Sequence, residues 1–279
     1  MKSILAPFLL WTVALLLVLL PATGRAQNDL AISLGFEYER GDYGGDREVS
    51  SYAVPLSLSW YPGERVDLTL TIPTLYQSRG TSVVLGNQRF SLPSNSQGAA
   101  QPPGNMGNDP DPQTPDTERS RSGLGDISLE AGYRLQHETQ RSPLVRLILY
   151  GKFPTADEKE GLGTGALDLG IGAGTGKWFG DWSLYMEGMY IRTGRSQSYA
   201  PDNYWTFLAA LDRLLSARLQ AGVSLSAATA AFGGDDILEI SGNLAWLLTD
   251  RVTVRGYLGT GLTDSSAAIS GGVAAGLSF

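Results

Sequence analysis

Apolar and polar residues alternate along most of the chain, with the period of two that is typical of β-strands. In DLAISLGFEYER (29–40), one face carries Leu30, Ile32, Leu34, Phe36 and Tyr38, and the other carries Ala31, Ser33, Gly35, Glu37 and Glu39. The same alternation recurs around residues 51–60, 66–72, 125–135, 145–149, 167–171, 182–186, 205–211, 219–225, 238–246, 252–258 and 269–279. The pattern therefore predicts twelve strands.

The connections between these strands alternate in length. Short ones lie at YPGER, HETQRSP, WFGDW, LDRLLSAR and LLTDR, whereas the others are longer or richer in Gly, Asp and Ser, and the longest spans about 77–125. Short turns at one end, long loops at the other and an even strand number are the layout of a bacterial outer-membrane barrel. We expect an all-β transmembrane antiparallel barrel of about twelve strands, from about Asp29 to Phe279, with both termini periplasmic.

A soluble β-sandwich is the alternative, since it also has alternating strands. Two features favour the barrel. Aromatic residues sit near the ends of the apolar faces, as in a membrane-interface girdle, and the opposite face carries charges that a dry core would exclude. These aromatic residues are Tyr38, Tyr52, Trp60, Tyr133, Trp178, Trp182, Tyr190, Trp205 and Trp246. The last strand, with apolar odd-numbered residues and terminal Phe279, should pair with the first and close the ring.

The first 26 residues have the features of a secretory signal peptide: Lys2, a long apolar run, and small residues before Gln27. An uncleaved membrane anchor is the alternative. Removal of Lys2 and Arg25 would change the formal net charge from -7 to -9, which argues against a nucleic-acid partner. The 27–279 remainder has no second long apolar run, and the absence of Cys excludes disulfides and thiolate chemistry.

Strand parity predicts which charged residues face the lumen. They are Glu37, Asp67, Asp126, Glu130, Asp168, Glu187 and Glu239, with Arg134, Arg146, Lys152, Arg218 and Arg255. Such charges either brace the wall as a ladder of ion pairs or form a transverse field that orients a polar solute. Inward Tyr150, Tyr185 and Tyr257 either stack on a solute or fill space.

Catalysis is not expected. The single His137 lies in a short turn, far from any mid-barrel serine, and no cluster of His or Cys could bind a metal. The glycines of GLGTGALDLGIGAGTG alternate along a strand and do not open a helix, so they indicate no nucleotide or other cofactor.

The 77–125 connection contains a run dense in Pro, Asn, Asp, Ser and Gly. It is either a disordered extracellular loop, which the composition favours, or a loop inserted into the lumen as a constriction. The acidic loop residues Asp157, Glu158, Glu160, Asp235 and Asp236 either bind divalent cations that bridge lipopolysaccharide or are simply solvated.

The central third of the chain resembles the outer-membrane transporter family named for the MetA pathway of phenol degradation. The matching residues are Gly125, Asp126, Lys152, Pro154, Thr155, Asp157, Gly163, Thr164, Gly165, Asp168 and Trp182, while Ala156 stands where glycine is usual. The resemblance implies outer-membrane uptake or export of small solutes, aromatic ones included. Because the chain has no energy source, we expect passive passage of small solutes, aromatic or otherwise hydrophobic ones included, through a barrel in contact with the bilayer. The terminal strand ending at Phe279 resembles the signal read by the barrel-assembly machinery. The rival interpretation is a non-conducting structural or adhesive barrel that acts through its long acidic loops.

Overall fold

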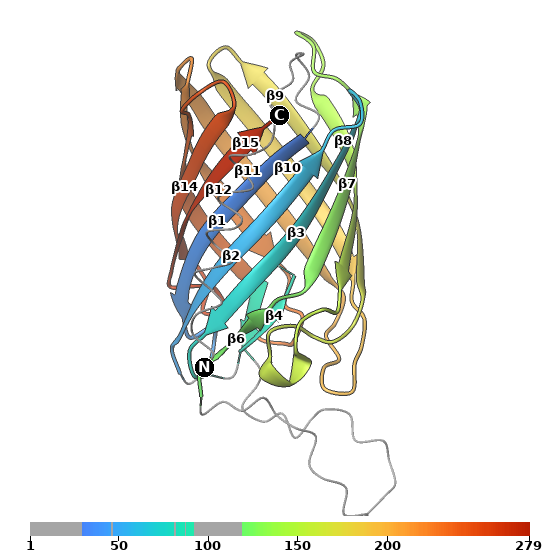
Figure 1. Ribbon diagram of the computed structural model, residues 1–279, viewed down its shortest axis with the longest axis vertical. Coiled ribbons are helices and arrows are strands. Elements are labelled where there is room, and N and C mark those ends of the chain that lie inside the picture. Colours follow the sequence, from blue (N-terminus) through green and yellow to red (C-terminus); the bar gives the residue numbers. More distant parts are fainter. Residues whose placement is uncertain (1–29, 46, 81, 87, 92–118) are drawn as a thin grey trace, which may run out of the picture.

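The computed structural model describes residues 30–45, 47–80, 82–86, 88–91 and 119–279. Within these ranges, twelve long antiparallel strands form one closed sheet (Figure 1), as predicted. They are β1 (Leu30–Gly41), β2 (Val49–Trp60), β3 (Val66–Gln77), β7 (Ile127–Gln136), β8 (Leu144–Phe153), β9 (Asp168–Phe179), β10 (Trp182–Arg192), β11 (Tyr204–Ser216), β12 (Leu219–Ala228), β13 (Ile237–Leu247), β14 (Val252–Gly261) and β15 (Ile269–Ser278).

The ring closes between the first and last strands. β1 and β15 pair from Ala31 opposite Ser278 to Arg40 opposite Ile269. Beyond the ladder, the backbone N–H of Phe279 donates to the carbonyl of Leu30 at 2.9 Å. Closure leaves no strand edge with unpaired backbone groups, which a membrane-spanning sheet requires. The predicted pairing of the terminal strand with the first is confirmed.

The large apolar side chains point outward. Leu258 is 74% exposed and Ile171 is 62% exposed, whereas a soluble protein would bury most such residues. Exposed aromatic side chains lie near both ends of the outer face, as predicted for membrane interfaces. The rings of Tyr38 and Tyr52 lie 5.1 Å apart at one end, and those of Tyr190 and Trp205 also lie 5.1 Å apart. Trp60, Tyr133, Trp178, Trp182 and Trp246 lie near the other end.

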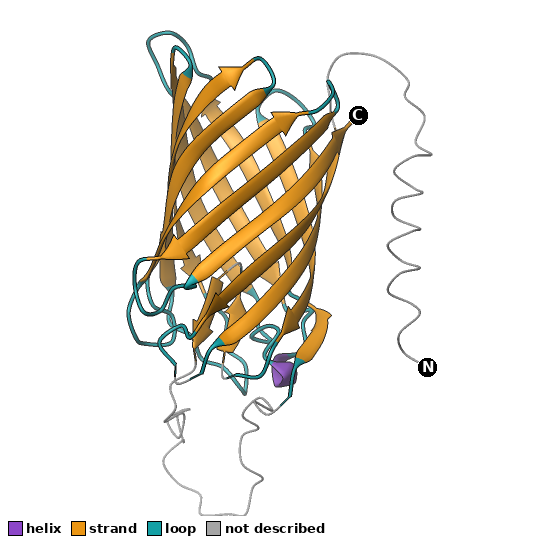
Figure 2. Cartoon of the chain, turned by 90° about the vertical axis from the view of Figure 1, so that its left-hand side faces the viewer, coloured by secondary structure: helices purple, strands orange, loops and turns teal. Residues whose placement is uncertain are grey.

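The two ends of the barrel differ, as Figure 2 shows. The connections at 61–65, 137–143, 180–181, 217–218 and 248–251 form the short-turn end. Those at 42–48, 154–167, 193–203, 229–236 and 262–268 form the long-loop end, where a 3-10 helix, η2 (Glu158–Glu160), begins at its N-cap Asp157. Leu30 and Phe279 lie at the short-turn end, and the periplasmic location of that end stays a prediction. None of the described helices is long or apolar enough to span a membrane.

A pair of prolines interrupts the sheet ladder. Pro55 on β2 lies opposite Pro73 on β3, and proline has no N–H to donate. The β1–β2 pairing stops at Leu34 and resumes at Glu37, so it skips the level of Pro55. A Cβ on Gly35 would lie 3.0 Å from the Pro55 ring, so this close approach of the two strands favours glycine. We call this level of the wall the proline seam.

Beside the seam, β3 changes partner from β7 to the short strand β6 (Arg121–Leu124), with a shift in register around Gly125. Two further strands, β4 (Ser82–Leu85) and β5 (Gln88–Ser91), form a separate hairpin within the connection that follows β3. The signal peptide predicted for residues 1–26 and the polar run at 92–118 lie outside the described residues.

Candidate functional site

The β4–β5 hairpin lies inside the long-loop end of the barrel (Figure 1). Ser82 pairs with Ser91 and Leu85 with Gln88, and Gly86 at the turn has a φ of +61°, which favours glycine. Val83 and Leu85 have no exposed surface, and Phe90 is also buried. The hairpin therefore lies inside the lumen, whereas Arg121–Leu124 of the same connection pairs with β3 in the wall. The run at 92–118 lies outside the described residues, so for it both alternatives stay predictions.

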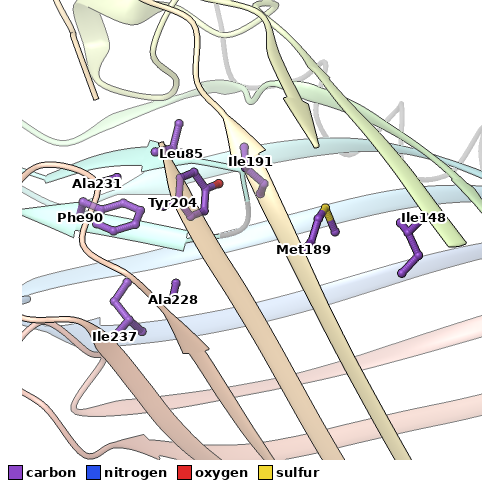
Figure 3. Close-up of a cluster of buried hydrophobic side chains, with 9 residues drawn as sticks. All are labelled: Leu85, Phe90, Ile148, Met189, Ile191, Tyr204, Ala228, Ala231 and Ile237. Carbon is purple, nitrogen blue, oxygen red and sulfur yellow. The ribbon is translucent and has the colours of Figure 1, made fainter. Parts of the chain in front are cut away.

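One face of the hairpin is apolar and packs on the barrel wall (Figure 3). Leu85 and Phe90 join a buried cluster contributed by β8, β10, β11, β12, β13 and the loop after β12. The phenyl ring of Phe90 lies 6.1 Å from the ring of Tyr204 and 5.9 Å from that of Phe232. The remaining members are Ile148, Met189, Ile191, Ala228, Ala231 and Ile237. Burying each large apolar side chain contributes about 1.5 to 3 kcal/mol, so this contact fixes the hairpin against the wall.

The other face of the hairpin is polar and contacts β1 and β3. Arg89 donates to the side-chain oxygen of Gln77, and its Nε lies 3.8 Å from a carboxylate oxygen of Glu39. Gln77 in turn donates to the carbonyl of Ser82 at 2.9 Å. Because Arg89 and Gln77 are both buried, these contacts replace water that the two side chains would otherwise bind. The hairpin is thus attached to opposite walls of the lumen.

Two cavities border the hairpin, and a third lies nearer the short-turn end. The acidic cavity, about 370 Å³, lies between the hairpin and the β1–β3 wall. A second cavity, about 340 Å³, lies between the hairpin turn and β7–β12; we call it the apolar cavity for its Met189, Ile191 and Phe207 side chains, although two glutamates also line it. The short-turn cavity, about 420 Å³, is lined by β1 and β11–β15. Glu37 and Tyr257 line both the acidic and the short-turn cavities, so these two side chains lie at the boundary between the two spaces.

The predicted lumenal charges form two groups with different surroundings. In the first, Arg146 on β8 lies among three carboxylates. It donates to Asp67, to Glu130 at 2.8 Å, and lies 3.8 Å from Glu187. Tyr185 donates to Glu187 as well. These side chains come from β3, β7, β8 and β10, which lie side by side in the sheet with only β9 between β8 and β10. The group therefore braces one side of the wall and leaves an excess of negative charge there.

The second group is the buried clasp of Lys152, Asp126, Asp168 and Thr164. The Nζ of Lys152 lies 2.9 Å from both aspartates and donates to Thr164 at 2.6 Å. Asp126 accepts from the backbone N–H of Ala156, and Asp168 accepts from that of Gly194. Lys152 has no exposed surface, so the clasp joins the β8–β9 and β10–β11 loops to the wall.

The clasp explains why glycine occurs at positions 163 and 165 of the segment that resembles the transporter family. A Cβ on Gly163 would lie 2.6 Å from an oxygen of Asp126, and Gly165 has a φ of +69°. Both glycines are therefore required for the loop to wrap around the charged group. The sequence predicts a charged lumen wall beside open water at Asp126, Lys152 and Asp168. These side chains are instead buried beneath the loops. Asp126 also borders the acidic cavity.

The remaining predicted residues occupy three locations. Tyr150 lines the apolar cavity, Glu239 lines the acidic cavity, and Arg255 lines the short-turn cavity. Arg134 lies on the inner face near the rim, where it donates to the carbonyl of Glu64 at 2.9 Å. The placement of Arg218 was wrong: β11 ends at Ser216, so Arg218 lies in the exposed turn and pairs with Asp250 at 3.3 Å.

Several residues that shape the lumen were missing from the prediction. Arg89, Leu85 and Phe90 belong to the hairpin, and Asp212 lines the short-turn cavity. The hairpin has a local signal, because SVVLGNQRFS places a Gly-Asn pair between two short alternating runs. Asp212 was hidden because β11 alternates weakly in sequence.

Among the titratable groups of the connections, Tyr199 and Glu138 have shifted pKa values. Burial raises the pKa of Tyr199, whose hydroxyl donates to the carbonyl of Glu158 at 3.2 Å. A hydrogen bond from the backbone N–H of Trp178, together with nearby Lys177, lowers the pKa of Glu138. Tyr199 therefore joins two long loops, Glu138 joins the 137–143 turn to β9, and neither lines the three cavities.

The acidic loop residues serve the loop structure. Asp157 caps η2 by accepting from Lys159 N, Glu160 pairs with Arg119 at 2.6 Å, and Asp236 accepts from Ala230 N. In the part of the chain that the structure describes, no three His, Asp or Glu side chains are grouped so that they could hold a metal ion.

Solved structures with similar folds are outer-membrane barrels. The COG4313 outer membrane channel from Pseudomonas putida F1 superposes with a TM-score of 0.65 at 14% identity, covering 92% of this chain and all (100%) of that one. The KdgM porin in complex with disordered oligogalacturonate superposes with a TM-score of 0.52 at 8% identity, covering 88% of this chain and 99% of that one. The translocator domain of the autotransporter NalP from Neisseria meningitidis superposes with a TM-score of 0.52 at 12% identity, covering 98% of this chain and 96% of that one. No curated protein sequence matches the chain.

The apolar outer face, the closed sheet and these similarities identify an outer-membrane β-barrel in contact with the lipid bilayer. A family model described as "Putative MetA-pathway of phenol degradation" matches residues 52–279, which include the hairpin, the clasp and all strands from β3 to β15. The protein therefore belongs to this family.

Proposed function

We propose that the protein is a passive outer-membrane channel for small solutes, aromatic ones included, and that the β4–β5 hairpin is its constriction. The observation that carries the proposal is that Glu37 and Tyr257, at the boundary between the acidic and short-turn cavities, line both spaces beyond the hairpin. A twelve-strand ring is wider than the eight-strand barrels that side chains fill completely. A hairpin attached to both walls narrows this interior without filling it.

The apolar cavity supports the passage of aromatic solutes. Tyr150, Met189, Ile191 and Tyr204 form its apolar and aromatic side, while Glu130 and Glu187 supply acceptors for a hydroxyl or amine. A flat ring with one polar substituent matches both surfaces. Aromatic residues and a few convergent polar groups are the usual lining of a small-molecule site.

We propose no catalytic function for the protein. His137 lies in the 137–143 turn, away from the cavities. We also propose that the short-turn end is periplasmic, that Phe279 contacts the barrel-assembly machinery, and that the loops at the other end face lipopolysaccharide. The short turns at one end and the longer loops at the other support this membrane orientation.

The rival function is a non-conducting structural or adhesive barrel, and the buried hairpin is the feature that favours it. Planar-bilayer recordings separate the two functions. We expect small, discrete conductance from the full chain, and a larger conductance when a short Gly-Ser linker replaces residues 82–91. Liposome swelling with benzyl alcohol, against a bulky sugar as control, should show uptake of the smaller solute. Absence of conductance from both proteins in the bilayer would contradict the proposed channel function.

A further inference from the structure

The charged side chains that line the cavities are predominantly acidic: Glu37, Glu39, Asp126, Glu130, Glu187, Asp212 and Glu239, against Arg89 and Arg255. Three basic side chains are met by carboxylates: Arg146 faces Asp67, Glu130 and Glu187, the buried Lys152 faces Asp126 and Asp168, and Arg89 faces Glu39. These three are therefore neutralised by their neighbours, whereas Arg255 has no such partner among the described residues, and carboxylates remain in excess. A narrow space lined by one sign of charge concentrates ions of the opposite sign.

Glu37 lies at the boundary between the acidic and the short-turn cavities. Its side chain lines both the acidic and the short-turn cavities, and among the described residues it makes no hydrogen bond or ion pair. Asp212 and Arg255, which line the short-turn cavity, likewise have no such partner in the described ranges. Two of these three charged side chains, Glu37 and Asp212, are acidic. Glu37 lies at the boundary between the acidic and short-turn cavities.

A tyrosine ring flanks this carboxylate. A Cβ on Gly272 would lie 2.6 Å from the ring carbon Cε1 of Tyr257 and 3.2 Å from Cγ of Glu37, so the two side chains border the same glycine. An aromatic face beside a carboxylate is a combination that attracts cations, through the ring quadrupole and the negative charge together. The same carboxylate repels an anion.

Resting on the proposed channel function, we infer that the lumen selects for cationic solutes, and that Glu37 with Tyr257 is the specificity-determining pair. An aromatic ring that carries an ammonium group fits both parts of the path: the ring matches the apolar cavity, and the charge matches Glu37. Neutral aromatic solutes pass more slowly, and aromatic carboxylates are repelled. Arg255 weakens the preference without reversing it.

Two measurements test this inference. The first is the reversal potential under a KCl gradient, which reports the ratio of cation to anion permeability. A unit charge about 7 Å from an ion in water changes its local concentration about threefold, and salt screening reduces this to about twofold. We expect a ratio above one for the unaltered protein, about a twofold fall in Glu37→Gln, and a rise in Arg255→Gln.

Asp212→Asn provides a second lumenal variant in case Glu37→Gln folds poorly, and it should also lower the ratio. Asp181→Asn, in the exposed β9–β10 turn, removes the same charge outside the lumen and should leave the ratio unchanged. A ratio of one or below in the unaltered protein would overturn the inference. So would equal effects of Asp181→Asn and of the two lumenal variants.

The second measurement is liposome flux of three solutes of similar shape, benzylammonium, benzyl alcohol and benzoate, each after subtraction of its flux into protein-free liposomes. We expect flux in that order, and Glu37→Gln should slow benzylammonium while leaving benzyl alcohol unchanged. Flux of all three at the same rate would overturn the charge preference and leave the channel function standing. Absence of flux for all three would instead contradict the proposed function itself.

Discussion

At the scale of single residues, Lys152 is the charge whose loss should matter most for stability. Lys152→Met leaves two carboxylates buried without their cation, which costs about 3 to 5 kcal/mol in comparable buried pairs. We expect a lower denaturant midpoint for unfolding in detergent micelles. The triple neutral variant Asp126→Asn, Lys152→Met and Asp168→Asn should recover most of the loss. Equal stability of the single variant and the unaltered protein would show that the clasp does not hold the loops.

The two faces of β8 give a second prediction. Leu149 is 59% exposed on the outer face, so Leu149→Arg places a charge toward lipid and should destabilise the barrel by about 2 to 4 kcal/mol at mid-depth. Gln220→Arg adds the same side chain to the short-turn cavity and should fold normally. Folded yield in lipid vesicles measures both. A harmless Leu149→Arg together with a damaging Gln220→Arg would mean that the faces are reversed.

At the scale of elements, the attachment of the hairpin can be broken from one side. Leu85→Asp places a charge in the buried cluster, so the hairpin should detach from the wall and single-channel conductance should rise. Val84→Asp is the matched control, because Val84 lies on the opposite face of β4 and lines the acidic cavity. It should change ion selectivity more than conductance. Equal conductance in Leu85→Asp and Val84→Asp would argue against this apolar attachment.

The elements also show how far a sequence can be interpreted. The twelve long strands and their faces follow from alternation, because lipid on one side and water on the other impose opposite chemistry on successive residues. The hairpin escaped prediction because its apolar residues pack against inward-facing Ile148 and Met189, which interrupt the polar inner face. Only the three-dimensional arrangement shows that these two departures from the pattern belong together.

The charged residues show the same limit. Parity placed Arg146 and Glu37 on the inner face, since a strand offers only two directions. It could not separate Lys152, which is closed in by loops, from Glu37, which borders open cavities, because burial depends on segments distant in sequence. Arg218 was misplaced since a strand that ends two residues earlier no longer fixes the direction of its side chain.

At the scale of the whole molecule, the closed ring predicts a β-sheet fold that stays compact in detergent. Detergent-folded protein should give a β-rich circular dichroism spectrum and should migrate faster on a gel before boiling than after it, because a closed barrel stays compact in detergent. Boiled protein provides the control for the unfolded position. A helical spectrum, or full solubility without detergent, would contradict a membrane barrel.

The proline seam has a consequence for how such a ring opens. A closed sheet has no terminal strand from which fraying can start, so local opening must begin where the ladder is already incomplete. Pro55 and Pro73 have no amide hydrogen, and the ladder between β1 and β2 is broken at their level. Amides next to the two prolines, such as those of Val54 and Thr74, should therefore exchange with deuterated solvent before those of the unbroken ladder between β9 and β10.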